Sequence, residues 1–112
     1  AATEAKIAEG APTIAPYWQG VDVCEVWPYP PTGVREKITA DGAAPIVVVG
    51  TTNDPATPYE WSQSLAKTLD SGVLVSWEGE GHTAYGRSNE CIAGAVDAYL
   101  LDGTVPEDGL VC

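Results

Sequence analysis

Residues 44–77 read APIVVVGTTNDPATPYEWSQSLAKTLDSGVLVSW, and this stretch decides the fold. Its first part, 44–50, contains an Ile/Val run without polar alternation, which is typical of a parallel strand covered on both faces. Residues 73–77 predict a second buried strand. A helix between these strands makes a strand–helix–strand unit, and the right-handed crossover of such a unit makes the two strands parallel.

The helix between the strands is predicted to start at residues 57–60, TPYE. A Thr cap, Pro at the first helical position and Glu three residues after the cap indicate a capping box. The buried stripe is expected to follow helical spacing and to comprise Trp61, Leu65, Ala66 and Leu69. Gly72 is expected to end this helix in a left-handed conformation.

A last helix is predicted from about Asn89 to Leu101, with Gly103 at its end. Its buried face is expected to comprise Ile92, Ala95, Val96, Tyr99 and Leu100. Residues 1–44 are irregular and rich in Pro and Gly, and they leave room for short helices at Thr3–Glu9 and Pro16–Val23.

We therefore predict an irregular part, 1–44, with short helices, and a βαβα part, 45–112. The second part belongs to a three-layer α/β fold in which helices flank two parallel strands.

Charge and length exclude several classes of function. The 112 residues contain 16 Asp and Glu against 5 Lys and Arg, a net charge of -11. Nucleic acids and anionic lipid surfaces are poor partners for such a chain, because both are bound by clustered basic side chains. No apolar run approaches the roughly 18 residues of a membrane span. The acidic excess is most simply a solvated face.

The cysteines and the first residues indicate a piece of a longer chain. Three cysteines in an oxidising compartment imply one pair and one thiol whose partner lies elsewhere. The alternative is three reduced cysteines in a cytosolic protein. The chain starts AATE, without Met and without a signal-peptide pattern, so we expect a processed product or a fragment.

Two loops are expected to leave the carboxyl ends of the parallel strands, where open α/β sheets bind ligands. The loop 51–58 contains Asp54, and the loop 78–85 contains His82, the one histidine of the chain. Asp before His at adjacent strand ends is the order of the last two members of the α/β-hydrolase triad. A carboxylate that accepts the imidazole Nδ1 proton fixes the tautomer and stabilises the imidazolium.

Each of these residues also has a simpler interpretation. Asp54 could form an ordinary turn before Pro55, and His82 could be a surface histidine. Tyr59 and Trp61 are expected to pack in the core or at the cap instead of touching substrate. One His and three Cys offer no plausible tetrahedral metal set, and neither a calcium loop nor a phosphate loop is present, so we expect no metal or cofactor.

Several segments resemble one family over about residues 15–112. These are 45–59 (PIVVVGTTNDPATPY), 78–82 (EGEGH), 89–92 (NECI), 98–104 (AYLLDGT) and the terminal Cys112. They resemble the carboxyl-terminal domain of the tripeptidyl-aminopeptidase-like α/β-hydrolases, which are exported serine peptidases and carboxylesterases. The stretch 24–28 (CEVWP) resembles the point where that family's chain returns from its cap to the core domain.

The resemblance implies a role for several residues. Asp54 would be the triad acid and His82 the general base. Cys91 and Cys112 would form the family's terminal disulfide, and Cys24 would be an orphan that pairs with a cysteine upstream of this chain. Residues 1–44 would be the return segment from the cap, and 45–112 the carboxyl-terminal portion of a secreted or cell-surface catalytic domain.

The chain lacks the Gly-x-Ser-x-Gly turn that carries the family's nucleophile. Its nearest imitation, around Ser88, has no second glycine and follows the histidine, so Ser88 is not the expected nucleophile. By resemblance, the serine lies in an amino-terminal portion of the same protein, which would be the partner of this chain. The isolated chain is then expected to be inactive.

For the parent protein we expect hydrolysis of a peptide or ester substrate. A tripeptidyl aminopeptidase-type exopeptidase is favoured over a related carboxylesterase. A non-catalytic processed module with a binding or structural role is the rival interpretation.

Overall fold

The computed structural model describes residues 2–17, 26–34 and 36–112, apart from the side chains of 2–4. The chain divides into two compact units, Ala1–Arg35 and Glu36–Cys112. The first unit contains helix α1 (Ala2–Gly10) and the 3-10 turn η1 (Ala15–Tyr17). Helix α1 confirms the first predicted helical piece. Most of the second piece, Pro16–Val23, lies outside the described residues, and so does Cys24.

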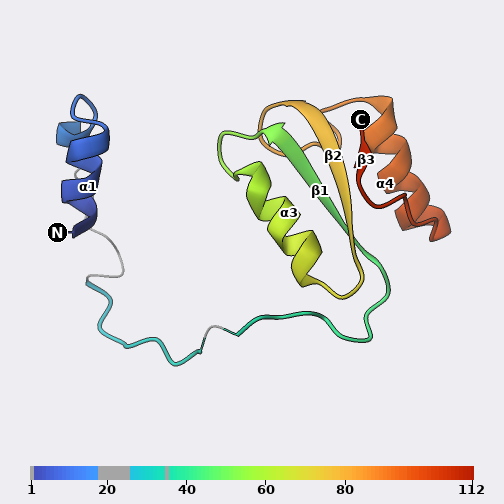
Figure 1. Cartoon of the computed structure of the whole chain (residues 1–112), viewed down its shortest axis with the longest axis horizontal. Coiled ribbons are helices and arrows are strands. Elements are labelled where there is room, and N and C mark those ends of the chain that lie inside the picture. The colour runs from blue at the N-terminus through green and yellow to red at the C-terminus, as the bar shows by residue number, and fades with distance from the viewer. Residues whose placement is uncertain (1, 18–25, 35) are drawn as a thin grey trace. The chain divides into compact units, whose positions relative to one another are not determined.

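The second unit is a small parallel sheet with a helix after each of its two long strands (Figure 1). Its elements, in chain order, are β1 (Ile46–Asn53), α3 (Tyr59–Thr68), β2 (Gly72–Glu80), α4 (Glu90–Asp102) and β3 (Leu110–Val111). The strand order is β1-β2-β3, and both pairings are parallel. The predicted strand–helix–strand unit is confirmed, although both strands run beyond their predicted ends. The short strand β3 was not predicted.

The two helices cover opposite faces of the sheet, which gives the predicted three layers (Figure 1). One face packs against α4 through Val47, Val49, Val75 and Trp77, which surround Ile92 and Val96. On the other face, an added Cβ at Gly50 would lie only 2.8 Å from Ser62 and 3.0 Å from Tyr59 of α3. There the Tyr59 hydroxyl also lies 2.6 Å from the hydroxyl of the buried Ser76.

The predicted buried stripe of α3 is wrong for two of its residues. Ala66 is buried, but Trp61 is 64% exposed and Leu65 is also exposed. Because the helix contacts the sheet through Tyr59, Ser62 and Ala66, these two side chains point away from the sheet. Trp61 is therefore neither core nor cap packing.

The predicted left-handed ending of α3 at Gly72 is also wrong, since Gly72 does not have positive φ and is the first residue of β2. Glycine is still required there. An added Cβ would lie 2.2 Å from the carbonyl oxygen of Ala66, so only glycine allows the strand to start so close to the helix.

Helix α4 confirms the predicted last helix and both of its ends. The side chain of Asn89 accepts a hydrogen bond from the amide of Ile92 at 3.0 Å, and Gly103 ends the helix with φ of 70°. Ile92 is fully buried as expected. Leu100 is exposed, so its predicted place on the buried face is wrong.

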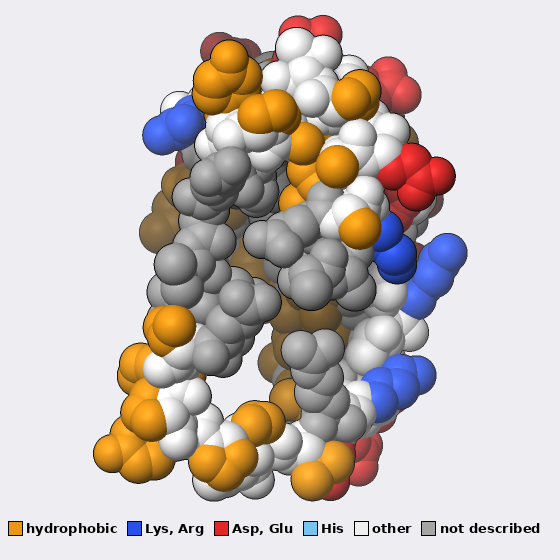
Figure 2. All heavy atoms as spheres, turned by 90° about the vertical axis from the view of Figure 1, so that its left-hand side faces the viewer, with side chains coloured by type: hydrophobic (Ala, Val, Ile, Leu, Met, Phe, Trp, Pro, Cys, Tyr) orange, Lys and Arg blue, Asp and Glu red, His pale blue; other side chains and the backbone are white. Residues whose placement is uncertain are grey.

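Large apolar side chains are exposed in both units, and Figure 2 shows hydrophobic side chains at the surface of one face. On the two flanking helices they are Trp61, Leu65, Leu100 and Leu101. Within the described ranges, no helix is long and apolar enough to cross a bilayer.

A disulfide joins Cys91, in the first turn of α4, to Cys112, one residue after β3, with a Cα–Cα distance of 5.7 Å. The chain between them runs through α4 and returns along the edge of β2. The amide of Cys112 donates to the carbonyl of Ser76 at 2.8 Å, so the bridge holds β3 where it pairs with the sheet.

Replacing both bridge cysteines, as Cys91→Ser with Cys112→Ser, should lower the free energy of unfolding by about 3 kcal/mol, because the unfolded chain regains the freedom of a loop of this length. Urea unfolding of the oxidised chain measures this, and the reduced wild type should match the double variant. The Cys24→Ser variant is the control and should unfold like the wild type. A loss of stability in Cys24→Ser alone would contradict the assigned bridge.

Candidate active site at the strand ends

The candidate site lies where β1 and β2 end, at the carboxyl edge of the sheet. Asp54 directly follows β1, and His82 comes two residues after β2. The Nδ1 atom of His82 lies 3.1 Å from Oδ1 and 3.0 Å from Oδ2 of Asp54. The structure therefore brings together the acidic residue and the histidine that the sequence placed on separate loops.

The Asp54 carboxylate is enclosed by donors from its own loop. Its Oδ1 accepts from the amides of Ala56 at 2.8 Å and Thr57 at 2.9 Å. Its Oδ2 accepts from the Thr57 hydroxyl at 2.9 Å and from the Thr83 amide at 3.4 Å. Asp54 thus forms an ordinary turn and contacts the histidine at the same time, so the two interpretations of this residue are compatible.

These hydrogen bonds hold the pKa of the Asp54 carboxyl well below its usual range. The Thr57 amide has the largest effect, desolvation opposes it, and the Ala56 amide, the His82 ring and the Thr57 hydroxyl add to the lowering. The side chain is only 5% exposed, against 50% for His82. Asp54 is therefore ionised at neutral pH although it is almost covered.

The ionised carboxylate determines which His82 nitrogen carries the shared proton. A carboxylate can only accept hydrogen bonds, so Nδ1 of His82 is the donor in this contact. In the neutral imidazole, Nε2 is then the acceptor. Since the ring is half exposed, Nε2 remains free to take a proton from a group outside the described residues.

The backbone on both sides of His82 is unusual. Gly81 has φ of 114° and Thr83 has φ of 65°. A β-branched residue with positive φ is uncommon and costs about 1–3 kcal/mol. This conformation directs the Thr83 amide to Asp54. The Oδ2 atom of Asp54 therefore contacts both the ring of His82 and the amide of Thr83.

The site also contains Thr57, whose role there the sequence pattern does not predict. The pattern predicts that Thr57 caps α3 in a capping box, but α3 begins after Pro58 without a side-chain cap, and the Thr57 hydroxyl donates to Asp54 instead. The predicted capping box is therefore wrong. The spacing Asp54-Pro-Ala-Thr57 is the sequence feature that could have indicated this contact. Asp and Thr side chains form hydrogen bonds with nearby loop atoms as readily as with helix ends.

The hydroxyl of Ser88 is buried and makes no hydrogen bond to any described residue. It lies in a surface depression before α4, among residues 86–90 and Ala93. The structure therefore does not link Ser88 to the ring of His82. Nor do the described side chains include any group of three or more His, Cys, Asp or Glu that could hold a metal ion.

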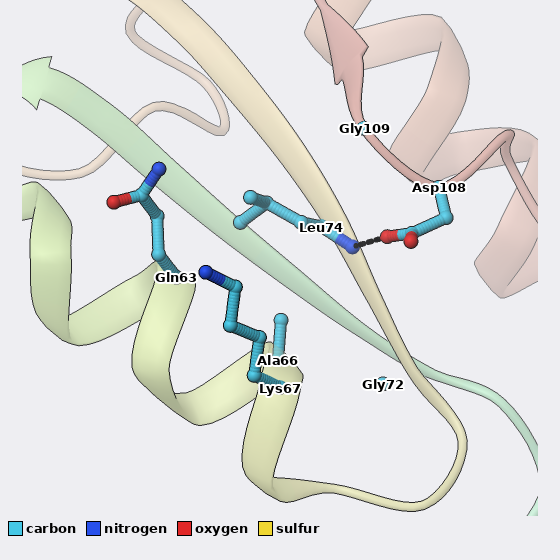
Figure 3. A pocket seen from close by; sticks show the side chains of 7 residues that line it. All are labelled: Gln63, Ala66, Lys67, Gly72, Leu74, Asp108 and Gly109. Atoms are coloured by element: carbon cyan, nitrogen blue, oxygen red, sulfur yellow. Dashed lines mark hydrogen bonds between the residues drawn. The ribbon is translucent and has the colours of Figure 1, made fainter.

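Figure 3 shows a second hollow. It is lined by Gln63, Ala66, Lys67, Gly72, Leu74, Asp108 and Gly109. Its volume of about 170 Å³ is small beside the roughly 300–1,000 Å³ of most ligand sites. Gly72 begins β2, so this hollow is close to the opposite end of the strand from His82. Asp108 accepts from the Leu74 amide at 2.8 Å, which is a structural contact at the strand edge.

Acidification should remove the stability that Asp54 contributes. Because its pKa is lowered on folding, this contribution is complete above the unfolded pKa of about 4 and is lost as the pH falls through the folded pKa. The difference in unfolding free energy between the wild type and Asp54→Asn should shrink as the pH falls below about 4. Chemical unfolding across this range measures it, with the exposed Asp41→Asn as control; equal pH dependence in the two variants would contradict the assignment.

Comparison with known proteins agrees with the fold described above. The model of the TAP-like protein family matches residues 11–112. The chain is 43% identical over 91 residues to Carboxylesterase B and 44% identical over 89 residues to Serine protease Hip1, both of Mycobacterium tuberculosis, and 31% identical over 90 residues to Tripeptidyl aminopeptidase of Streptomyces lividans.

Each match covers 80% or 81% of this chain but 17% of the relative, so the chain corresponds to a small part of the length of these proteins. The family match extends over nearly the whole chain, and the parallel sheet with flanking helices agrees with it. This chain belongs to the TAP-like family of α/β-hydrolases.

Proposed function

We propose that this chain is the carboxyl-terminal part of a serine hydrolase and supplies the Asp and His of its catalytic triad. The observation that carries the proposal is the contact between Nδ1 of His82 and the nearly covered carboxylate of Asp54 at 3.0–3.1 Å. Family membership supports it, since relatives of this chain are named as a serine protease, an aminopeptidase and a carboxylesterase.

In the proposed reaction, Nε2 of His82 takes the proton of a serine hydroxyl while the serine oxygen attacks a carbonyl carbon. The proton then passes from Nε2 to the leaving amine or alcohol as the carbonyl–leaving group bond breaks and an acyl-enzyme remains. Water attacks the acyl-enzyme with the same proton shuttle. Asp54 stays ionised throughout and stabilises the imidazolium that forms in each half of the reaction.

The serine would come from an amino-terminal portion of the same protein, because the sequence contains no nucleophile turn. Two features support such a partner. Among the described residues β1 pairs on one side only, so its outer edge has free amides and carbonyls of the kind that another strand satisfies. Apolar side chains are exposed on both flanking helices.

For the substrate, we propose peptides cleaved by an exopeptidase of the tripeptidyl aminopeptidase type. Ester hydrolysis is the second candidate, because the relative named Carboxylesterase B is 43% identical over the matched region. The Cys91–Cys112 bridge supports a secreted or cell-surface location, since disulfides persist in oxidising compartments.

In the full-length parent protein, His82→Ala and Asp54→Ala should each lower kcat/KM by about 10³-fold or more, because the serine loses its general base or that base loses its orientation. Hydrolysis of a tripeptide p-nitroanilide and of a p-nitrophenyl ester measures the loss and separates the two candidate substrates. Asp41→Asn is the surface control. Unchanged turnover in folded His82→Ala protein would favour the rival interpretation, a non-catalytic module.

The 112-residue chain alone should be inactive and should not react with a fluorophosphonate, since activated serines are the target of this probe. Intact-mass measurement after incubation should show the unmodified chain of 11.7 kDa. The full-length protein is the positive control and should gain one adduct. An adduct on the isolated chain, mapped to Ser88, would overturn the assignment of the nucleophile to the amino-terminal portion.

A further inference from the structure

The β1–β2 pairing contains an irregularity immediately before the candidate site. Thr51 pairs with Trp77, and the next recorded pair is Asn53 with Glu80. Two steps along β1 therefore match three steps along β2, so β2 has one extra residue at this point. Such a bulge redirects the strand beyond it, and bulges are frequent next to active sites.

The bulge decides whether His82 can reach Asp54. Beyond it, the Gly81 amide donates to the carbonyl of Asn53 at 3.3 Å, and His82 follows at the level of Asp54. Without the extra residue, the register would slip by one position, which moves the chain by about 3.3 Å and turns every later side chain to the other face of the sheet. The contact between Nδ1 and the carboxylate would then be lost.

One side chain takes over the ladder contacts that the bulge removes. The Thr52 hydroxyl accepts from the amide of Gly79 at 3.2 Å and donates to the carbonyl of the same residue at 3.3 Å. A hydroxyl has one donor and two acceptor sites, so it can make both bonds at once. These bonds join β1 to Gly79, one of the two residues between the paired Trp77 and Glu80, across a partly buried part of the sheet.

The neighbours of Gly79 leave it little freedom. An added Cβ would lie 2.2–2.6 Å from atoms of the Trp77 ring, which itself packs against the core. On the other edge of β2, the Glu78 amide donates to the Cys112 carbonyl at 3.1 Å. The bulge is therefore confined between the core, β3 and Thr52.

We propose that Thr52 is a positioning residue for the reaction proposed above, and that its hydroxyl holds the β2 bulge in the register that aligns His82 with Asp54. The inference rests on the proposed function, in which His82 is the general base. Thr52 does not touch the reacting atoms; it acts through Gly79 and the strand that leads to His82.

Variants of Thr52 in the full-length protein test the proposal. Thr52→Val keeps the shape and removes the hydroxyl, and Thr52→Ala removes it with less bulk. Both should lower kcat by about 10- to 100-fold with KM nearly unchanged, because a misplaced catalytic group slows the chemical step. Thr52→Ser retains the hydroxyl, so its kcat should lie within about threefold of the wild-type value.

Thr51→Val is the matched control, because the neighbouring Thr51 hydroxyl is buried and has no hydrogen-bond partner among the described residues. It should leave kcat unchanged. A second readout is nitrogen NMR of the 112-residue chain, whose one histidine gives a single set of ring signals. The wild type and Thr52→Ser should show the Nδ1–H form, and Thr52→Val should show a mixture of tautomers.

The outcomes separate this inference from the proposed function. If His82→Ala abolishes turnover but Thr52→Val and Thr52→Ala have wild-type kcat, the inference is wrong and the triad stands. If Thr52→Ser fails to restore kcat, or if Thr51→Val loses as much activity as Thr52→Val, the effect is general destabilisation and the inference is also wrong. The same holds if neither Thr52→Val nor Thr52→Ala folds. Full turnover in His82→Ala overturns the proposed function itself.

Discussion

The nearly covered carboxylate of Asp54 is the constraint on which the rest of the site depends. A desolvated charge is unfavourable unless several donors surround it. Here the donors come from two loops: Ala56 and Thr57 follow β1, and His82 and Thr83 follow β2. Because both loops share one acceptor, displacing either loop leaves the charge with fewer hydrogen bonds. The ends of the two strands are thereby joined into one structure.

The strands beneath the loops have to be placed accurately relative to each other for this contact to form. Close approach at Gly50 lets α3 pack directly on β1, and the Tyr59–Ser76 hydroxyl contact ties the same helix to β2. On the opposite face, the apolar core around Val75 and Ile92 holds α4. The Asp–His geometry is therefore a property of the packed strands and not of the loops alone.

We propose that the arrangement works as part of a larger enzyme. An imidazole oriented by a carboxylate is a general base that needs a nucleophile, and the relatives of this chain are about six times longer than the region it matches, since that region is 17% of their length. The open edge of β1 in the described structure and the exposed apolar side chains of α3 and α4 agree with that view. The division of labour, with the acid and base here and the serine elsewhere, remains our proposal.

The sequence by itself determined the two long strands, their parallel pairing, the helix α4 with its end at Gly103, and the placement of Asp54 and His82 at one sheet edge. These follow from local periodicity, helix-ending residues and the order of the elements, which can be recognised in short stretches of sequence. Only the tertiary structure decided the exposure of Trp61, the partner of Thr57, the pairing of β3 and the bulge beside Thr52. Each of these depends on which of several possible partners a side chain or strand edge contacts in the folded chain. The local sequence pattern does not show which partner that is.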